Sequence, residues 1–342
     1  MALITGRERV LAQYRIAAQK GWTLPCFGSE NLTTSEACLA AAQEMAEVHG
    51  WARIPLILAL TITYAHRPQA VLYTHSRRWE TGVRLALADL EVLTRADGPY
   101  PRVDCMLHLD HAQHDSDRAL LEGWDLSAFS SVMYDASTLP FAENCLATSD
   151  FVARHGRTLV IEGACDEIIN AGGAEDSPLS SVEQAVAFAR SGVDLMVANL
   201  GTEHRASAAS LHYRGDLARS ISRAVGSRLV LHGASSVPPE QVRGLFADGV
   251  VKCNIWTSLE RDSSPALVEF LAKDAGKAVG AAHALRLREQ GFLGPASSVE
   301  VHAALSHCTT AARQEIIFHR MKAIAGGYLD QWFHDSHKQA TN

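Results

Sequence analysis

The stretch VDCMLHLDHAQHD (103–115) begins as an apolar run and ends as a polar cluster, with three histidines and two aspartates between His108 and Asp115. An apolar run that does not alternate with polar residues is typical of a strand buried on both faces, as in a parallel sheet. Three histidines so close in sequence could form a local metal site, or only some of them could be ligands. In α/β barrels, functional side chains collect where strands end. The stretch therefore predicts a buried strand that leads into a functional site.

Seven other apolar runs have the same character and are rich in valine, isoleucine and leucine. They lie at 23–27, 54–60, 129–134, 158–163, 193–200, 228–233 and 249–255. The segments between them carry helix signals, such as the proline start and glycine end of 238–249 and the capping-box spacing of Ser180 and Glu183. Eight strand and helix units predict an α/β fold, the (β/α)8 TIM barrel. A doubly wound open sheet is the alternative, but no G-x-G-x-x-G follows the first strand.

The domain organisation follows from the same pattern. We expect residues 1–262 to form the barrel as the catalytic domain, with a helix over 1–20 before the first strand. Residues 263–342 are Ala-rich and mostly helical in pattern, with a break at 288–298, and exceed what a barrel needs. We expect these extra C-terminal helices to pack on the barrel or to form a subunit interface.

Composition excludes several classes of protein. With 342 residues, 47% of them hydrophobic, the chain can bury a large core. A net charge of −7 argues against a nucleic-acid partner, and no apolar run is long enough for a transmembrane helix. The N-terminus has no signal-peptide pattern. Seven scattered cysteines without a C-x-x-C pair indicate reduced thiols. We therefore expect a cytoplasmic protein with neither nucleic acid nor membrane as a partner.

Polar residues mark the ends of several predicted strands, which a barrel would bring to one rim. They are His108, Asp110, His111, Glu162, His204, His232 and Asn254. Histidines at the ends of the third, sixth and seventh strands would converge above the barrel, and three histidines with an open position are a pattern of catalytic zinc. The barrel hypothesis thus predicts one metal ligand from the opening stretch and two from elsewhere.

Seven segments, read in order from about residue 20 to 260, resemble one family. They are LPCFGSENLTTSEACLAAA, HLDHAQ, SSVMYDAS, IEGACDEIINAGGAED, GTEH, LVLHGASSVP and KCNI. The chain resembles the class II, zinc-dependent ketose-bisphosphate aldolases, the group of fructose- and tagatose-bisphosphate aldolases, as a divergent member.

The resemblance implies a role for each matched residue. The three histidines His111, His204 and His232 would bind one catalytic Zn²⁺. Asp110 would move the proton of the aldehyde-derived hydroxyl, and Glu175 would take the α-proton of the substrate. The remaining matched residues would bind the substrate or support the site. Asn254, Gly233, Ser235, Thr257 and Thr61 belong to the first group, and His108 and Glu162 to the second. The expected partner is a small carbonyl or phosphate substrate, in a homodimer or homotetramer.

Departures from the family fall among the residues that would bind substrate. Arg205 follows the second zinc histidine where the family has glycine, and Trp256 replaces an aspartate. Gly28 replaces an asparagine, and Ala164 replaces a second glutamate. We expect Arg205 and Trp256 to contact a substrate that is anionic but differs from fructose 1,6-bisphosphate. An ordinary fructose- or tagatose-bisphosphate aldolase and a metal-binding pseudoenzyme with a scaffold role are the alternatives.

Overall fold

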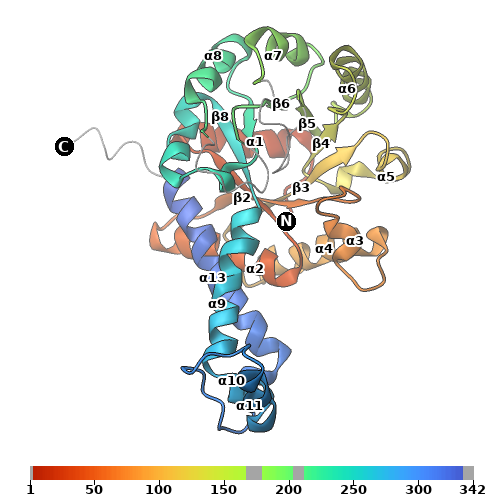
Figure 1. The fold of residues 1–342 in the computed structure, drawn as a ribbon. Coiled ribbons are helices and arrows are strands. Elements are labelled where there is room, and N and C mark those ends of the chain that lie inside the picture. Colours follow the sequence, from red (N-terminus) through yellow and green to blue (C-terminus); the bar gives the residue numbers. More distant parts are fainter. Residues whose placement is uncertain (1–2, 167–178, 203–211, 334–342) are drawn as a thin grey trace, which may run out of the picture.

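Eight parallel strands close into a barrel in the computed structural model, which describes residues 3–166, 179–202 and 212–333 (Figure 1). Each strand pairs with the next along the chain, and β8 pairs with β1. The strands are β1 Leu24–Gly28, β2 Ile54–Leu60, β3 Val103–Gln113, β4 Ser131–Asp135, β5 Val160–Ala164, β6 Leu195–Val197, β7 Leu229–Leu231 and β8 Val250–Ile255. The predicted TIM barrel is confirmed.

The strands are buried along nearly their whole length because helices cover the outside of the barrel and side chains fill its interior. The helices are α1 Arg7–Lys20, α2 Leu32–Val48, α3 Gln69–Leu72, α4 Trp79–Thr94, α5 Arg118–Gly123, α6 Phe141–His155, α7 Val182–Ala189, α8 Gly215–Val225, α9 Thr257–Lys273, α10 Ala275–Val279, α11 Ala281–Glu289, α12 Leu305–Cys308 and α13 Thr310–Trp332.

Two local predictions differ from the structure. The segment 238–249 forms two short 3₁₀ turns, Pro239–Val242 and Leu245–Asp248, instead of one helix. Gly244 lies between them, and a glycine inside a helix is unfavourable. The capping box of α7 uses Ser181 and Gln184, one residue after the expected pair.

The N-terminal helix α1 closes one end of the barrel. The Arg7 guanidinium lies 2.5 Å from the Asp194 carboxylate just before β6, and also donates to the Leu159 carbonyl just before β5. Because these contacts lie where strands begin, the opposite rim, where the strands end, is left for the site.

The C-terminal helices form a long arm (Figure 1). Helices α9 and α13 run side by side away from the barrel, and α10 and α11 lie at the far end of the arm. Helix α9 spans the expected boundary at 262, so the last barrel helix and the arm are continuous. At its other end α13 returns to the barrel, where the Trp332 indole donates to the Val242 carbonyl and Phe333 stacks on Trp22.

Candidate active site at the strand ends

A bulge at the end of β3 lets two successive side chains serve the same site. Side chains normally alternate between the two faces of a strand. Here the pairing of β3 with β4 shifts between Leu109 and Ala112, and His111 has a positive φ of 46°. Few residues other than glycine adopt this conformation, and such outliers cluster at functional sites. As a result, Asp110 and His111 are both buried beside the same third residue, His232.

The His111 ring is held from two sides. Its Nδ1 lies 2.8 Å from the Asp135 carboxylate at the end of β4, and its ring stacks on Tyr64 with a centroid distance of 4.3 Å. Asp135 also accepts hydrogen bonds from Gln113 and Ser137. Burial raises the pKa of Asp135, but the hydrogen bonds from His111 and Ser137 outweigh it and lower the pKa to about 2. The ionised Asp135 therefore orients His111 with Nε2 as the potential ligand atom.

Asp110, His111 and His232 each place one potential ligand atom within 4.8 Å of the others. Burial is the main effect on His232 and lowers its pKa to about 4, so the ring is neutral at physiological pH. An imidazole must be neutral to bind a metal ion, as His232 is. The buried donor set therefore fits a divalent metal ion. The third expected ligand, His204, lies outside the described residues, as do Arg205 and Glu175.

Asp110 is clamped between two side chains. Its Oδ2 lies 2.5 Å from Nη2 of Arg67, and its Oδ1 accepts from Nδ2 of Asn254 at 3.1 Å. Burial alone would raise the pKa of Asp110, but His111, His108 and Arg67 together hold it well below its usual range. Asp110 is therefore ionised and able to accept a proton.

A buried charge network lies beside this candidate metal-binding group of Asp110, His111 and His232. Lys252 on β8 is fully buried, with Nζ 2.6 Å from Glu162 and 3.0 Å from Nε2 of His108. Glu162 also lies 3.4 Å from Nε2 of His232, and His108 reaches Ser131 through Nδ1 at 2.8 Å. Burial raises the pKa of Glu162, but the charge of Lys252, together with His108 and His232, outweighs it and lowers the pKa to about 2. Thus His108 and Glu162 do contact the other site residues.

Lys252 was not singled out from the sequence, although a signal was present. A lysine in the middle of the apolar run GVVKCNI would be buried, because both faces of such a strand are covered, and a buried lysine needs a charged partner. A carboxylate from a non-adjacent strand, Glu162 on β5, satisfies that requirement.

Arg67, in the β2–α3 loop, is a second residue missed from the sequence. Its guanidinium carbon lies over the Trp256 ring, 5.1 Å from the centroid, and the Trp256 indole donates to Glu30 at 2.6 Å. A side chain at Gly28 would crowd this arrangement, because a Cβ there would lie 3.0 Å from Nη1 of Arg67. The loop 61–69 carries no local pattern that predicts a contact with Asp110.

Three other residues expected to bind substrate, Thr61, Ser235 and Thr257, differ in their contacts and exposure. The Thr61 hydroxyl donates to the backbone carbonyl of Arg67 and so holds the loop. Ser235 follows Gly233 after β7, and its hydroxyl donates to Ser258 at 3.1 Å. Thr257 is the first residue of α9 and is partly exposed.

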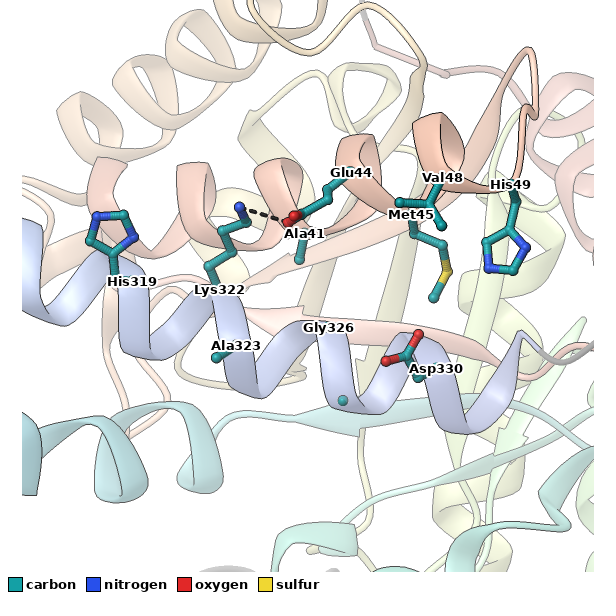
Figure 2. Close-up of a pocket in the computed structure, with 11 residues that line it drawn as sticks. Ala41, Glu44, Met45, Val48, His49, His319, Lys322, Ala323, Gly326 and Asp330 are labelled. Atoms are coloured by element: carbon teal, nitrogen blue, oxygen red, sulfur yellow. Dashed lines mark ion pairs between the residues drawn. The ribbon is translucent and has the colours of Figure 1, made fainter.

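Two cavities differ in their relation to these residues. One of about 330 Å³ reaches His111 and Asp135 and is lined by Tyr64 and His66 from the β2–α3 loop. A larger one of about 530 Å³ lies between α2 and α13, where Glu44 and Lys322 form an ion pair at 2.6 Å (Figure 2). The larger cavity includes none of the site residues, so we assign the chemistry to the first.

A TIM barrel with buried carboxylates and histidines together at its strand ends defines an enzyme site of the metal-dependent type. A family model described as "Fructose-bisphosphate aldolase class-II" matches residues 8–323. The chain belongs to this family and is an aldolase, a carbon–carbon lyase. The family is generally metal-dependent, which agrees with the buried histidine and carboxylate group.

Relatives and solved structures give the same result at low identity. A fructose-bisphosphate aldolase of Streptococcus pyogenes serotype M1 is 25% identical over 79% of this chain and 84% of its own. Fructose-bisphosphate aldolase from Campylobacter jejuni superposes with a TM-score of 0.70 at 17% identity, covering 96% of both chains. The YdjI aldolase of Escherichia coli K12 superposes with a TM-score of 0.62 at 17% identity, covering 95% of this chain and 97% of its own. These two superpositions establish the shared fold.

Proposed function

We propose that this chain is a zinc-dependent aldolase whose substrate is an anionic, ketose-like molecule other than fructose 1,6-bisphosphate. The observation that carries the proposal is the position of Asp110. It is ionised, buried beside His111 and His232, and bound to Arg67, which is not part of the expected site.

In the cleavage direction Asp110 would accept the proton of the substrate hydroxyl, and in the addition direction it would return it. The Oδ1 atom of Asn254 is buried without a hydrogen-bond partner among the described residues, so it can accept a hydrogen bond from a substrate hydroxyl. His111, His232 and, by resemblance, His204 would hold a divalent ion, which would supply Lewis-acid stabilisation of the developing negative charge. Glu175 is proposed to move the α-proton.

The wall formed by β8 and β1 supports a changed substrate. Trp256 covers this side of the rim, and Glu30 holds its indole. Glu260, on the first turn of α9, has a pKa raised to about 7, mainly by burial and further by the charge of Glu30. The Glu30 carboxylate against the indole is unfavourable for a second phosphate group at this side of the rim. We propose that Arg205, with Gly233 and Ser235, completes the anion site.

Metal analysis and proton exchange test the proposal. The purified protein should contain or bind one zinc ion, and should exchange the α-proton of dihydroxyacetone phosphate or dihydroxyacetone with solvent. Fructose 1,6-bisphosphate should be a poor substrate. Absence of any divalent-ion binding would refute the site. Zinc binding without exchange on any donor would support a scaffold role instead.

An ordinary fructose-bisphosphate aldolase is the second candidate, favoured by the family match and by the names of the relatives. Rapid cleavage of fructose 1,6-bisphosphate that is lost on adding EDTA would establish it.

We also propose a cytoplasmic homodimer or homotetramer, with the arm of α9 to α13 at the subunit interface. Light scattering on the purified protein, and on a variant with a charged residue at the exposed Leu305, would test the assembly.

A further inference from the structure

Arg67 is built into the rim of the barrel and not attached to its surface. Only 8% of the residue is exposed. The Thr61 hydroxyl and the Gln69 amide both donate to the carbonyl of Arg67, and the Arg67 amide donates to Tyr64 at 2.8 Å. These bonds hold the loop, so the guanidinium is pre-positioned beside Asp110.

The guanidinium keeps donors for a further group. It has five N–H donors, and the hydrogen bond to Asp110 uses one on Nη2. The Nε atom is buried without a hydrogen-bond partner among the described residues. Leaving a buried charged donor unsatisfied is unfavourable, so this edge of Arg67 is suited to bind an anionic oxygen of a ligand.

The stack with Trp256 limits how the guanidinium can turn. The ring lies on one face of it, and Gly28 leaves room for both because a Cβ there would lie 3.0 Å from Nη1 and 3.1 Å from the Cβ of Trp256. A planar guanidinium with limited freedom to turn matches a carboxylate better than a rotating ammonium group would. Gly28, Arg67 and Trp256 therefore act as one unit.

Distance decides where the ligand anion sits. The substrate oxygen that Asp110 serves would lie within hydrogen-bonding distance of Asp110, as Nη2 of Arg67 does at 2.5 Å. An anion bound at the Nε edge of Arg67 would therefore lie near the reacting oxygen. A carboxylate bonded directly to the reacting carbon puts an oxygen within about 3 Å of that atom, whereas a phosphate two carbons further lies beyond it. The Glu30 carboxylate, which accepts from the Trp256 indole, would repel such a phosphate.

We propose that Arg67 determines substrate specificity by binding a carboxylate group of the substrate. This carboxylate is attached to the carbon whose oxygen exchanges a proton with Asp110, so the acceptor of the aldol reaction is a 2-oxo acid. This proposal rests on the aldolase function proposed above. In the addition direction of the reaction, the donor carbon forms a bond to the carbonyl carbon of the 2-oxo acid, and the C=O π bond breaks. Its oxygen takes up a proton that passes from solvent through Asp110, and the proton lost from the donor goes to the base and from there back to solvent. No atom or electron is left over.

Equilibrium binding tests the proposal without relying on turnover. Glycolate, which has a carboxylate beside a hydroxyl, is titrated into zinc-loaded protein, with glycolamide as the neutral analogue and inorganic phosphate as the alternative anion. Arg67→Met should weaken glycolate binding by about tenfold or more. Glycolamide binding should change little. Arg95→Met is the matched control, because Arg95 forms an exposed pair with Asp97 near the start of β3.

Arg67→Lys provides a second variant in case the methionine variant folds poorly. It keeps the charge but loses the planar pair of donors, and should give an intermediate glycolate affinity. Three results would overturn the proposal: no glycolate binding by the wild type at millimolar concentration, equal losses of glycolate and glycolamide in Arg67→Met, or Arg67-dependent binding of phosphate alone.

A kinetic comparison separates this proposal from the aldolase function. With dihydroxyacetone phosphate as donor, glyoxylate should be preferred over glycolaldehyde as acceptor, and the ratio of kcat/KM should fall about tenfold or more in Arg67→Met. An unchanged ratio would contradict the role of Arg67. Failure of proton exchange in the wild type, with the glycolate discrimination intact, would refute the aldolase function and leave the carboxylate site standing.

Discussion

Replacing Lys252 with methionine is expected to destabilise the barrel strongly, since it removes the counter-ion of a buried carboxylate. Lys252 and Glu162 are both fully buried and their charged atoms lie 2.6 Å apart. Breaking a buried ion pair by deleting one partner typically costs about 3–5 kcal/mol. A protein of ordinary stability has only about 5–15 kcal/mol in total, so the variant would lose a large part of it.

The loss should also reach the metal-binding group. Glu162 holds His232 at 3.4 Å, and Lys252 holds His108 at 3.0 Å. An unpaired Glu162 would take up a proton or change its contacts, which would release His232. We therefore expect weaker zinc binding by about 10–100-fold, as is usual when a residue that orients a ligand is changed.

Urea unfolding followed by fluorescence measures the stability, and competition with a chelator measures zinc affinity. The double variant Lys252→Met/Glu162→Gln is the matched control, because it removes both charges from the interior. It should be more stable than Lys252→Met alone. Two results would contradict the claim that Lys252 stabilises the fold by neutralising Glu162. One is equal destabilisation of the two variants, and the other is a Lys252→Met variant within about 0.5 kcal/mol of the wild type.

Three further predictions concern the site and its surroundings. His232→Ala should abolish zinc binding measured by elemental analysis, whereas His114→Ala, at a residue outside the metal-binding group, should retain it; equal loss would mean wrong ligands. Gly28→Ala should destabilise the protein by about 1–3 kcal/mol through overpacking, whereas Gly294→Ala, which meets no atom within 4 Å, should not; equal unfolding midpoints would refute the crowding. Glu260 has a folded pKa of about 7 against 4.5, so its protonated form is favoured in the fold and stability should fall as pH rises from 4.5 to 7. Glu260→Gln should therefore be about 1–3 kcal/mol more stable than the wild type at pH 8 and similar to it at pH 4.5; an advantage that is the same at both values would refute this assignment.

The barrel could be predicted from the sequence because the signal for each strand is local. A strand buried on both faces needs apolar residues at successive positions, and eight such runs alternate with helical segments. The order of short motifs such as HLDHAQ and LVLHGASSVP identified the family, since motifs in a fixed order are specific even when each is weak. The same local signals were less accurate at helix ends, as the capping box of α7 shows.

The contacts that define the site were decided by the tertiary structure. Arg67 and Asp110 are 43 residues apart, and Glu162 and Lys252 are 90 apart, so no local pattern links them. Closing the barrel brings the strand ends together, and the bulge at His111 turns two neighbouring side chains toward one centre. By itself the sequence determined which residue types line the rim. Their pairings depend on the packing of distant strands, because the energy of a buried charge depends on which partner the fold places next to it.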